Sequence, residues 1–252
     1  MQAAELYFVA GALLLYLLDS GVLLYGDELL FASGPRGWHN VAAGDVLLFG
    51  RRVLVPNPLT PGARVVRVCW SAASAGDATA TPAAVPPVDA VLAPAFLGAL
   101  RPLQAGVVML LGLIAVALPA LLYAFGQGPE LLLWLVTVYA LNLAMAVRLW
   151  RVRSRLGLGT RACFFLTVDL LLCPPFAINL VRKITLQQPP AGDPLWFARA
   201  QFGAPQFAAL CALLMRRVSA ELSVEEPGGA QHRRLQALGR RLEELAPCPP
   251  TS

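Results

Sequence analysis

The stretches LQAGVVMLLGLIAVALPALLYAF at residues 103–125 and LLLWLVTVYALNLAMAVRL at residues 131–149 decide the fold. Each is close to the roughly 20 apolar residues that a helix needs to cross a hydrocarbon core about 30 Å thick. Only the tight turn GQGPE at residues 126–130 separates them. Their lengths alone therefore predict a transmembrane helical hairpin.

The composition of the whole chain agrees with this hairpin. Of 252 residues, 57% are apolar and 14% charged, and the mean hydropathy is +0.62. An ordinary soluble domain is about 45–50% apolar and about 25% charged. This balance excludes a soluble globular protein. We expect an all-α polytopic membrane protein with about five transmembrane helices (three to five) and a small cytoplasmic β-rich insertion after the first helix.

The first apolar stretch, residues 6–25, predicts a transmembrane helix within residues 1–26. It has neither the basic region nor the small-residue cleavage site of a signal peptide, so we interpret it as an anchor. Asp19 lies inside it. A carboxylate at the middle of a helix costs about 2.5–3.5 kcal/mol on the insertion scale, so Asp19 is expected to need a partner.

Residues 27–70 differ in character from the hydrophobic segments. Short β-branched and Leu/Phe runs alternate with Gly, Pro and Asn, which predicts a small cytoplasmic β-rich unit of three or four strands. Residues 46–55 fit a hairpin that turns at Gly50. Residues 71–101 are rich in Ala and Pro and are interpreted as a linker to the transmembrane helical bundle, residues 102–215.

The number of crossings in the bundle depends on two ambiguous segments. Residues 162–181 are apolar but contain Asp169 and the pair Pro174–Pro175, and residues 201–215 are short for a crossing. Five spans are favoured. The alternatives are a re-entrant fourth segment, which leaves three spans, and a four-span arrangement.

The arginines set the expected orientation. Arginines crowd the loop after residue 147, and the turn at 126–130 has none, so the positive-inside rule places that loop in the cytoplasm. Five spans leave Arg182, Lys183 and Arg199 outside. The N-terminus is then outside, the C-terminus is cytoplasmic, and the location is a cell membrane, most simply a bacterial inner membrane.

Residues 216–252 predict a basic, amphipathic cytoplasmic tail. Within residues 230–246, leucines recur every three or four positions beside arginines. This pattern is typical of a helix lying on the anionic inner leaflet, and the alternative is a coiled-coil seam between protomers. The expected anionic-lipid contacts are Arg151, Arg153, Arg155, Arg233, Arg234, Arg240 and Arg241.

Three polar residues fall at nearly one depth in the predicted spans. Counted at 1.5 Å per residue, Asp19, Asn142 and Asp169 lie roughly 9, 9 and 12 Å from the cytoplasmic boundary. Because polar groups in spans usually face the bundle interior, we hypothesise one hydrogen-bonded cluster with at least one protonated carboxyl. Structural contact between helices is the favoured interpretation, and a proton or cation relay is the alternative.

No motif for catalysis, nucleotide binding or dinucleotide binding is present. The five cysteines are scattered, so free thiols are expected and neither a metal nor a cofactor. The arginines flank apolar segments, which argues against nucleic acid as a partner. We expect a non-enzymatic scaffold or accessory subunit of a membrane assembly, partnered by the bilayer and by a membrane protein or a second copy. The alternative is a small transporter or proton-coupled subunit that uses the intramembrane carboxylates.

Overall fold

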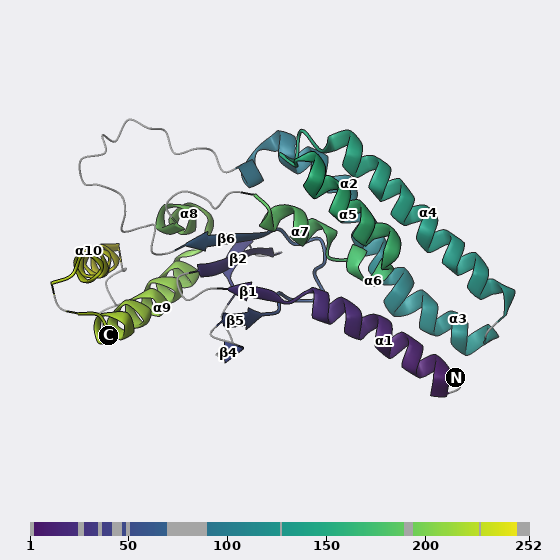
Figure 1. The fold of residues 1–252 in the computed structure, drawn as a ribbon, viewed down its shortest axis with the longest axis horizontal. Helices are drawn as coiled ribbons and strands as arrows, with labels where there is room; N and C mark the ends of the chain where they lie inside the picture. The colour runs from purple at the N-terminus through teal and green to yellow at the C-terminus, as the bar shows by residue number, and fades with distance from the viewer. Residues whose placement is uncertain are drawn as a thin grey trace. The chain divides into compact units, whose positions relative to one another are not determined.

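The computed structural model describes residues 3–24, 28–34, 37–41, 47–48, 51–69, 90–126, 128–188, 194–226 and 228–245. These residues are mostly helical, with a small sheet region early in the chain (Figure 1), as the sequence predicts. The chain divides into two compact units. Unit 1 comprises residues 1–23, 53–65 and 88–189, and unit 2 comprises residues 24–52, 66–87 and 190–252.

Unit 1 is a helical bundle. Its elements are α1 (Ala3–Asp19), η2 (Ala90–Leu92), α2 (Pro94–Gly112), the π-helical turn η3 (Leu113–Ala117), α3 (Leu118–Phe125), α4 (Pro129–Val152), α5 (Thr160–Leu172), α6 (Pro174–Ala177) and α7 (Leu180–Leu186). Helices α2, α4 and α6 each begin at a proline. Proline is tolerated there because the N–H of the first helical residue makes no hydrogen bond within the helix. The π-helical turn immediately precedes Pro119, whose ring excludes the ordinary helical hydrogen bond.

Two described helices are long and apolar enough to cross a membrane, Pro94–Phe125 and Pro129–Val152. They contain the two stretches that the sequence pairs in a hairpin, and α2 and α3 both pack against α4. A shorter apolar helix, Val9–Asp19, lies in α1. The count of five spans stays a prediction.

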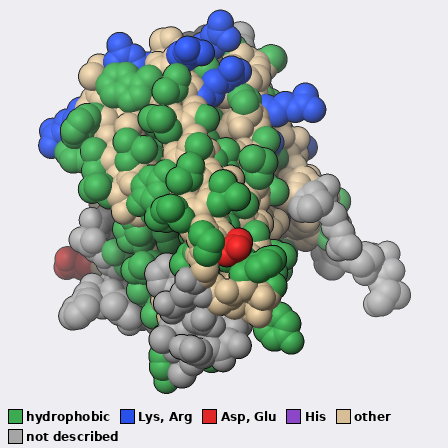
Figure 2. All heavy atoms as spheres, turned by 90° about the vertical axis from the view of Figure 1, so that its right-hand side faces the viewer, with side chains coloured by type: hydrophobic (Ala, Val, Ile, Leu, Met, Phe, Trp, Pro, Cys, Tyr) green, Lys and Arg blue, Asp and Glu red, His purple; other side chains and the backbone are tan. Residues whose placement is uncertain are grey.

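The outer surface of the bundle is apolar. Exposed large hydrophobic side chains follow α1, the α2–η3–α3 rod, α4 and α5, among them Leu6, Leu14, Leu18, Val108, Met109, Val116, Tyr123, Leu132, Leu133, Val136, Leu143, Phe164, Phe165 and Leu172. Figure 2 shows hydrophobic side chains over most of the face that it presents, with Lys and Arg along its upper edge. Soluble proteins rarely expose so many large apolar side chains on one surface, which together with the two span-length helices suggests a membrane location.

Residues 160–186 do not form one straight helix. The backbone of Cys173 is extended, with φ −139° and ψ 90°, and separates α5 from α6. Lys183 Nζ in α7 lies 2.8 Å from Asp169 Oδ2 in α5, although the two residues are 14 positions apart. A continuous helix would separate them by roughly 21 Å along its axis. The chain therefore turns back after Pro174–Pro175.

The described residues of unit 2 form sheet strands and three helices. One sheet has the strand order β3-β2-β6 and consists of β2 (Glu28–Gly34), β3 (Gly37–Asn40) and β6 (Val65–Cys69). The other sheet has the order β1-β5-β4 and consists of β1 (Val22–Leu24), β4 (Leu47–Leu48) and β5 (Arg51–Leu54). The division between the units falls within β1, β5 and β6. The antiparallel pair β4–β5, with Leu47 opposite Arg52, confirms the predicted strand pairing, and the predicted turn at Gly50 lies outside the described residues. The β2–β3 turn ends at Gly37, whose φ of 98° favours glycine.

An aromatic cluster joins the β3-β2-β6 sheet to α8 (Pro194–Gln201). The rings of Phe31 and Phe197 stack with centroids 5.8 Å apart, and Trp38 meets Phe197 edge-on at 5.3 Å. Phe202 contacts Phe31 at 4.9 Å. Residues after 190 thus share a core with the early strands, whereas the sequence had placed residues up to 215 in the membrane bundle.

Helix α9 (Ala204–Leu222) covers the predicted fifth span. It is not among the span-length apolar helices of the described chain, because arginines and a glutamate interrupt its second half. Its buried side chains are Phe207, Leu210, Cys211, Leu214 and Val218. One of those arginines, Arg217, also donates a hydrogen bond to the carbonyl oxygen of Glu28 in β2 at 3.4 Å.

The leucine row of α10 (Ala230–Leu245) packs within the chain. Leu235, Leu238 and Leu242 are buried, and α10 runs along α9. An added Cβ at Gly239 would lie 3.8 Å from Val218 of α9. Both sequence-based interpretations of this row, a lipid-facing helix and a seam between protomers, are therefore corrected: the apolar face is already covered by α9.

A close contact between α2 and α4 at Gly106 gives a test of this packing. An added Cβ at Gly106 would lie 2.5 Å from Met145 Sδ, so Gly106→Val should destabilise the bundle by about 1–3 kcal/mol. Thermal unfolding in detergent, followed by circular dichroism, measures the change. Gly112→Val is the matched control, because nothing lies within 4 Å of an added Cβ there. Adding Met145→Ala to Gly106→Val should cost less than the two single changes summed, and strict additivity would contradict the contact.

Candidate functional site

The polar centre of unit 1 is the ammonium group of Lys183. Lys183 Nζ lies 2.9 Å from Asp19 Oδ1 and 2.8 Å from Asp169 Oδ2, so α7 is tied to both α1 and α5. Asp19 ends α1, where the negative end of the helix dipole disfavours a carboxylate. The ring of Phe176 lies 5.2 Å from Nζ and adds a cation–π contact. Lys183 therefore offsets two charges that would otherwise be poorly placed.

Asn179 organises the other side of Asp19. Its Nδ2 donates to Asp19 Oδ2 at 3.0 Å and to the Tyr16 carbonyl oxygen at 3.2 Å. Its Oδ1 accepts from Ser20 Oγ at 3.1 Å and from Arg182 Nη1 at 3.2 Å. Asn179 is 1% exposed, and its amide is fully hydrogen-bonded in this way. The end of α1 is thus held against α7 by directional bonds as well as by charge.

Arg182 holds a loop over the cluster. Its side chain is buried, and Nη2 donates to the carbonyl oxygens of Asn57 and, at 3.1 Å, of Thr60. The hydroxyl of Tyr16 donates to the carbonyl oxygen of Pro58 in the same loop. This loop, residues 56–64, we call the cap loop.

The cap loop is also anchored at its far end. Gln104 Nε2 of α2 donates to the Gly62 carbonyl oxygen at 2.8 Å, and the backbone N–H of Val65 donates to Thr185 Oγ1 at 3.0 Å. Proline and glycine leave this loop few backbone hydrogen bonds of its own, so side chains of α1, α2 and α7 supply its partners. A stretch that the sequence assigned to the β-rich unit is therefore a part of unit 1.

The cluster balances its charges internally. Asp19 and Asp169 are the acids, and Lys183 and Arg182 are the bases. The side chains of Asp19 and Lys183 are 15% and 22% exposed, whereas that of Asp169 is 42% exposed. Chemically, this arrangement can fix helices in place, and it can change only if a carboxylate gains a proton or is released from Lys183.

Of the three predicted cluster residues, the structure brings two together. Asp19 and Asp169 share Lys183. Asn142 is fully buried in α4, and neither its Nδ2 nor its Oδ1 has a hydrogen-bond partner among the described residues.

Sequence reasoning missed Lys183, Asn179 and Arg182. The one signal available was that Lys183 is the sole lysine of the chain, just beyond the Pro174–Pro175 break. Treating residues 162–181 as one crossing placed this lysine on the far side of the membrane from Asp19. The turn of the chain after α5 removes that separation.

The predicted lipid-contacting arginines fall into two groups. Arg151 and Arg155 near the end of α4 are exposed, as are Arg233, Arg234 and Arg240 on α10, whereas Arg153 and Arg241 are half-buried. The Arg153 guanidinium lies 5.4 Å from the Trp150 ring centroid and donates to Thr160 Oγ1 at 2.8 Å. An arginine and a tryptophan at the end of a span-length helix are typical of a membrane interface.

Within the described part of the chain, no group of His, Cys, Asp and Glu is placed to hold a metal ion. Cys163, Cys173 and Cys211 are free thiols. In unit 2, burial raises the pKa of the Cys211 thiol, which keeps it protonated and unreactive. No protein family, curated protein or solved structure matches the chain.

Replacing Lys183 by Met should destabilise unit 1 strongly. Two carboxylates would lose their counter-charge, and breaking a buried ion pair costs about 3–5 kcal/mol. Because the side chain of Asp169 is partly exposed, we expect a loss of about 3 kcal/mol. The measurement is chemical or thermal unfolding of the purified protein in detergent. The triple variant Lys183→Met, Asp19→Asn, Asp169→Asn should recover much of the loss. A triple variant no more stable than Lys183→Met would contradict the charge argument.

Replacing Asn142 by Leu should leave stability unchanged or raise it by about 1–3 kcal/mol, because an unpaired buried amide keeps its desolvation cost. The same unfolding measurement tests this. Val138→Asn, on the same buried face of α4, is the reverse control and should be destabilising. A marked loss of stability in Asn142→Leu would show that the amide has a partner.

Proposed function

We propose that the chain is an integral protein of a bacterial inner membrane and serves as a non-enzymatic scaffold or accessory subunit. Unit 1 is the embedded part, which its exposed apolar surface and span-length helices support. The observation that carries the structural role is the pairing of Lys183 with both Asp19 and Asp169. Charges that pair with one another inside a bundle hold helices together, which supports a structural role for this cluster.

The topology that we propose has three crossings, formed by α1, by the α2–η3–α3 rod and by α4. The α5–α6–α7 segment is re-entrant, because Lys183 returns to Asp169. The N-terminus is then outside, and everything after α4 is on the cytoplasmic side. With this arrangement all 20 basic residues lie on the inner side, which satisfies the positive-inside rule better than five crossings do.

The proposed accessory role rests on the division of the chain into two compact units. Residues 24–52, 66–87 and 190–252 form a unit with its own aromatic core and its own α9–α10 helix pair. A separate unit of this size on the cytoplasmic side is suited to binding a membrane-protein partner or a second copy of the chain. Purification in mild detergent tests this: we expect a stoichiometric partner, or a stable homo-oligomer, to remain bound.

One observation favours the alternative, a proton-coupled subunit or small transporter. Two carboxylates share one ammonium, and Asp169 is 42% exposed, so a proton has access to the cluster. Asp169→Asn separates the two functions. In a scaffold this variant assembles normally and supports function, since Asp19 still pairs with Lys183. In a proton-coupled subunit it assembles normally but loses pH-driven uptake or proton flux in liposomes.

Cysteine labelling tests the proposed topology. In a cysteine-free background, an impermeant maleimide applied to intact spheroplasts should label Gln127→Cys, on the outer side. It should not label Gln187→Cys, which follows α7, until the membrane is opened. Ser154→Cys, an exposed residue in the arginine-rich turn after α4, is the matched inner-side control. Labelling of Gln187→Cys in intact spheroplasts would show that residues 160–186 cross the membrane.

A further inference from the structure

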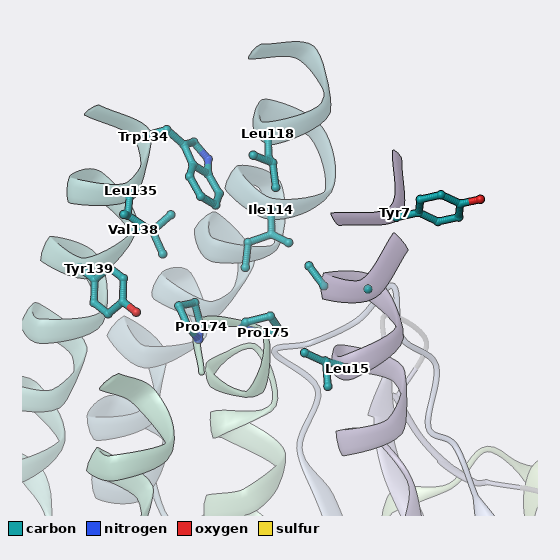
Figure 3. A pocket seen from close by; sticks show the side chains of 12 residues that line it. Tyr7, Leu15, Ile114, Leu118, Trp134, Leu135, Val138, Tyr139, Pro174 and Pro175 are labelled. Carbon is teal, nitrogen blue, oxygen red and sulfur yellow. The ribbon is translucent and has the colours of Figure 1, made fainter. Parts of the chain in front are cut away.

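A cavity of about 460 Å³ lies inside unit 1, between helices that are far apart in the sequence. Its walls come from α1, from the η3–α3 part of the second rod, from α4 and from the start of α6 (Figure 3). The residues that form these walls include Gly11, Leu15, Ile114, Leu118, Trp134 and Val138. The cavity is partly open on one side and is distinct from the Lys183 cluster.

The chemistry of the walls selects an apolar occupant. No charged side chain lines the cavity. The indole N–H of Trp134 is already used, because it donates to the Leu113 carbonyl oxygen at 3.0 Å. Tyr139 presents its hydroxyl towards Pro174, and Tyr7 points away from the cavity (Figure 3). Apolar cavities of this kind do not hold water stably, and leaving so large a volume empty would be costly.

The position of the cavity indicates where its occupant comes from. Two of its walls belong to the helices that are long and apolar enough to span a membrane. At its edges Leu15, Leu135 and Tyr139 are 43%, 42% and 40% exposed, so the cavity continues into the apolar outer surface of the bundle. An occupant therefore enters sideways from the hydrocarbon phase.

The size of the cavity favours a thin chain over a helix. A single helical turn is about 5.4 Å long and 10–12 Å wide, which corresponds to a volume on the order of 500 Å³. The cavity, at about 460 Å³, is far smaller than the roughly three to four turns of an ordinary helix, so a partner helix would lie mostly outside it. One unbranched hydrocarbon chain fits between the walls and can follow their irregular course.

We propose that this cavity binds one acyl chain of a bilayer phospholipid. The inference rests on the proposed embedding of unit 1 in a membrane. Bound lipid would fill the gap between α1 and α4 and stabilise α1, which is shorter than the other apolar helices. The chain binds by dispersion contacts with apolar side chains, and its headgroup remains outside the described cavity.

Gly11 offers a way to block the cavity. It is a wall residue, and nothing lies within 4 Å of an added Cβ, so Gly11→Phe places a ring in the cavity without a backbone clash. Gly112→Phe is the matched control, since Gly112 is exposed, lies outside the cavity and has equally free space around an added Cβ. Ala12→Phe is a second blocking variant in case Gly11→Phe does not fold.

The experiment uses the purified full chain in vesicles of phosphatidylethanolamine and phosphatidylglycerol. A small fraction of the phosphatidylglycerol carries a diazirine in the middle of one acyl chain. After irradiation, peptides containing residues 11–15 and 134–138 should be labelled several-fold more than the peptide with the exposed residues Val108 and Met109. Gly11→Phe should reduce this excess several-fold, and Gly112→Phe should leave it unchanged.

Three results would overturn the proposal. The first is labelling that is uniform over the apolar surface, and the second is an excess that survives both blocking variants. The third is a dimer in native mass spectrometry that Gly11→Phe dissociates, which would make a second copy the occupant. Flotation of the vesicles separates this inference from the proposed function: protein that does not float with lipid contradicts membrane embedding itself, whereas floating protein with uniform labelling contradicts only the acyl-chain site.

Discussion

The ammonium group of Lys183 is the constraint on which unit 1 depends. It contacts carboxylates from α1 and α5, which are 150 residues apart in the chain, and it does so from a helix that follows a proline break. In an apolar bundle an uncompensated carboxylate is more costly than on a protein surface, so the shared pairing with Lys183 stabilises the packing of these three segments. The pairing thus supports the turn of the chain after α5, although most of the surrounding contacts are apolar.

The same constraint explains the position of the cap loop. Arg182 immediately precedes Lys183 in the chain, and its buried guanidinium meets no carboxylate among the described residues. A buried guanidinium needs oxygen acceptors, and the carbonyl groups of the cap loop supply them. These carbonyl oxygens also accept backbone N–H groups of the loop, from Thr60 to Asn57 and from Ala63 to Thr60, so each uses a second lone pair for Arg182. The loop is thus held in unit 1 by the basic side chain next to the central lysine.

Much of the fold could be predicted from hydrophobic length and period. The two span-length helices, the turn between them and the β4–β5 hairpin follow from patterns that lie within 20 residues of one another. The residues of the candidate site could be predicted from the sequence only in part. Asp19 and Asp169 stand out because charge is rare in apolar segments, but their partner lies beyond a helix break, and hydropathy does not report the direction of the chain after such a break. Asn142 stood out for the same reason, and the structure gives it no partner among the described residues.

The C-terminal region shows why an amphipathic pattern does not identify its own partner. The leucine row of α10 is equally compatible with lipid, with a second protomer and with another helix of the same chain, since all three present apolar surface. In the structure the neighbour is α9, whose second half carries Arg216, Arg217 and Glu221. With these three charges α9 is not among the span-length apolar helices of the described chain. Its buried side chains lie on the side that carries Val218, which faces Gly239 of α10, so the leucine row finds its neighbour within the same unit.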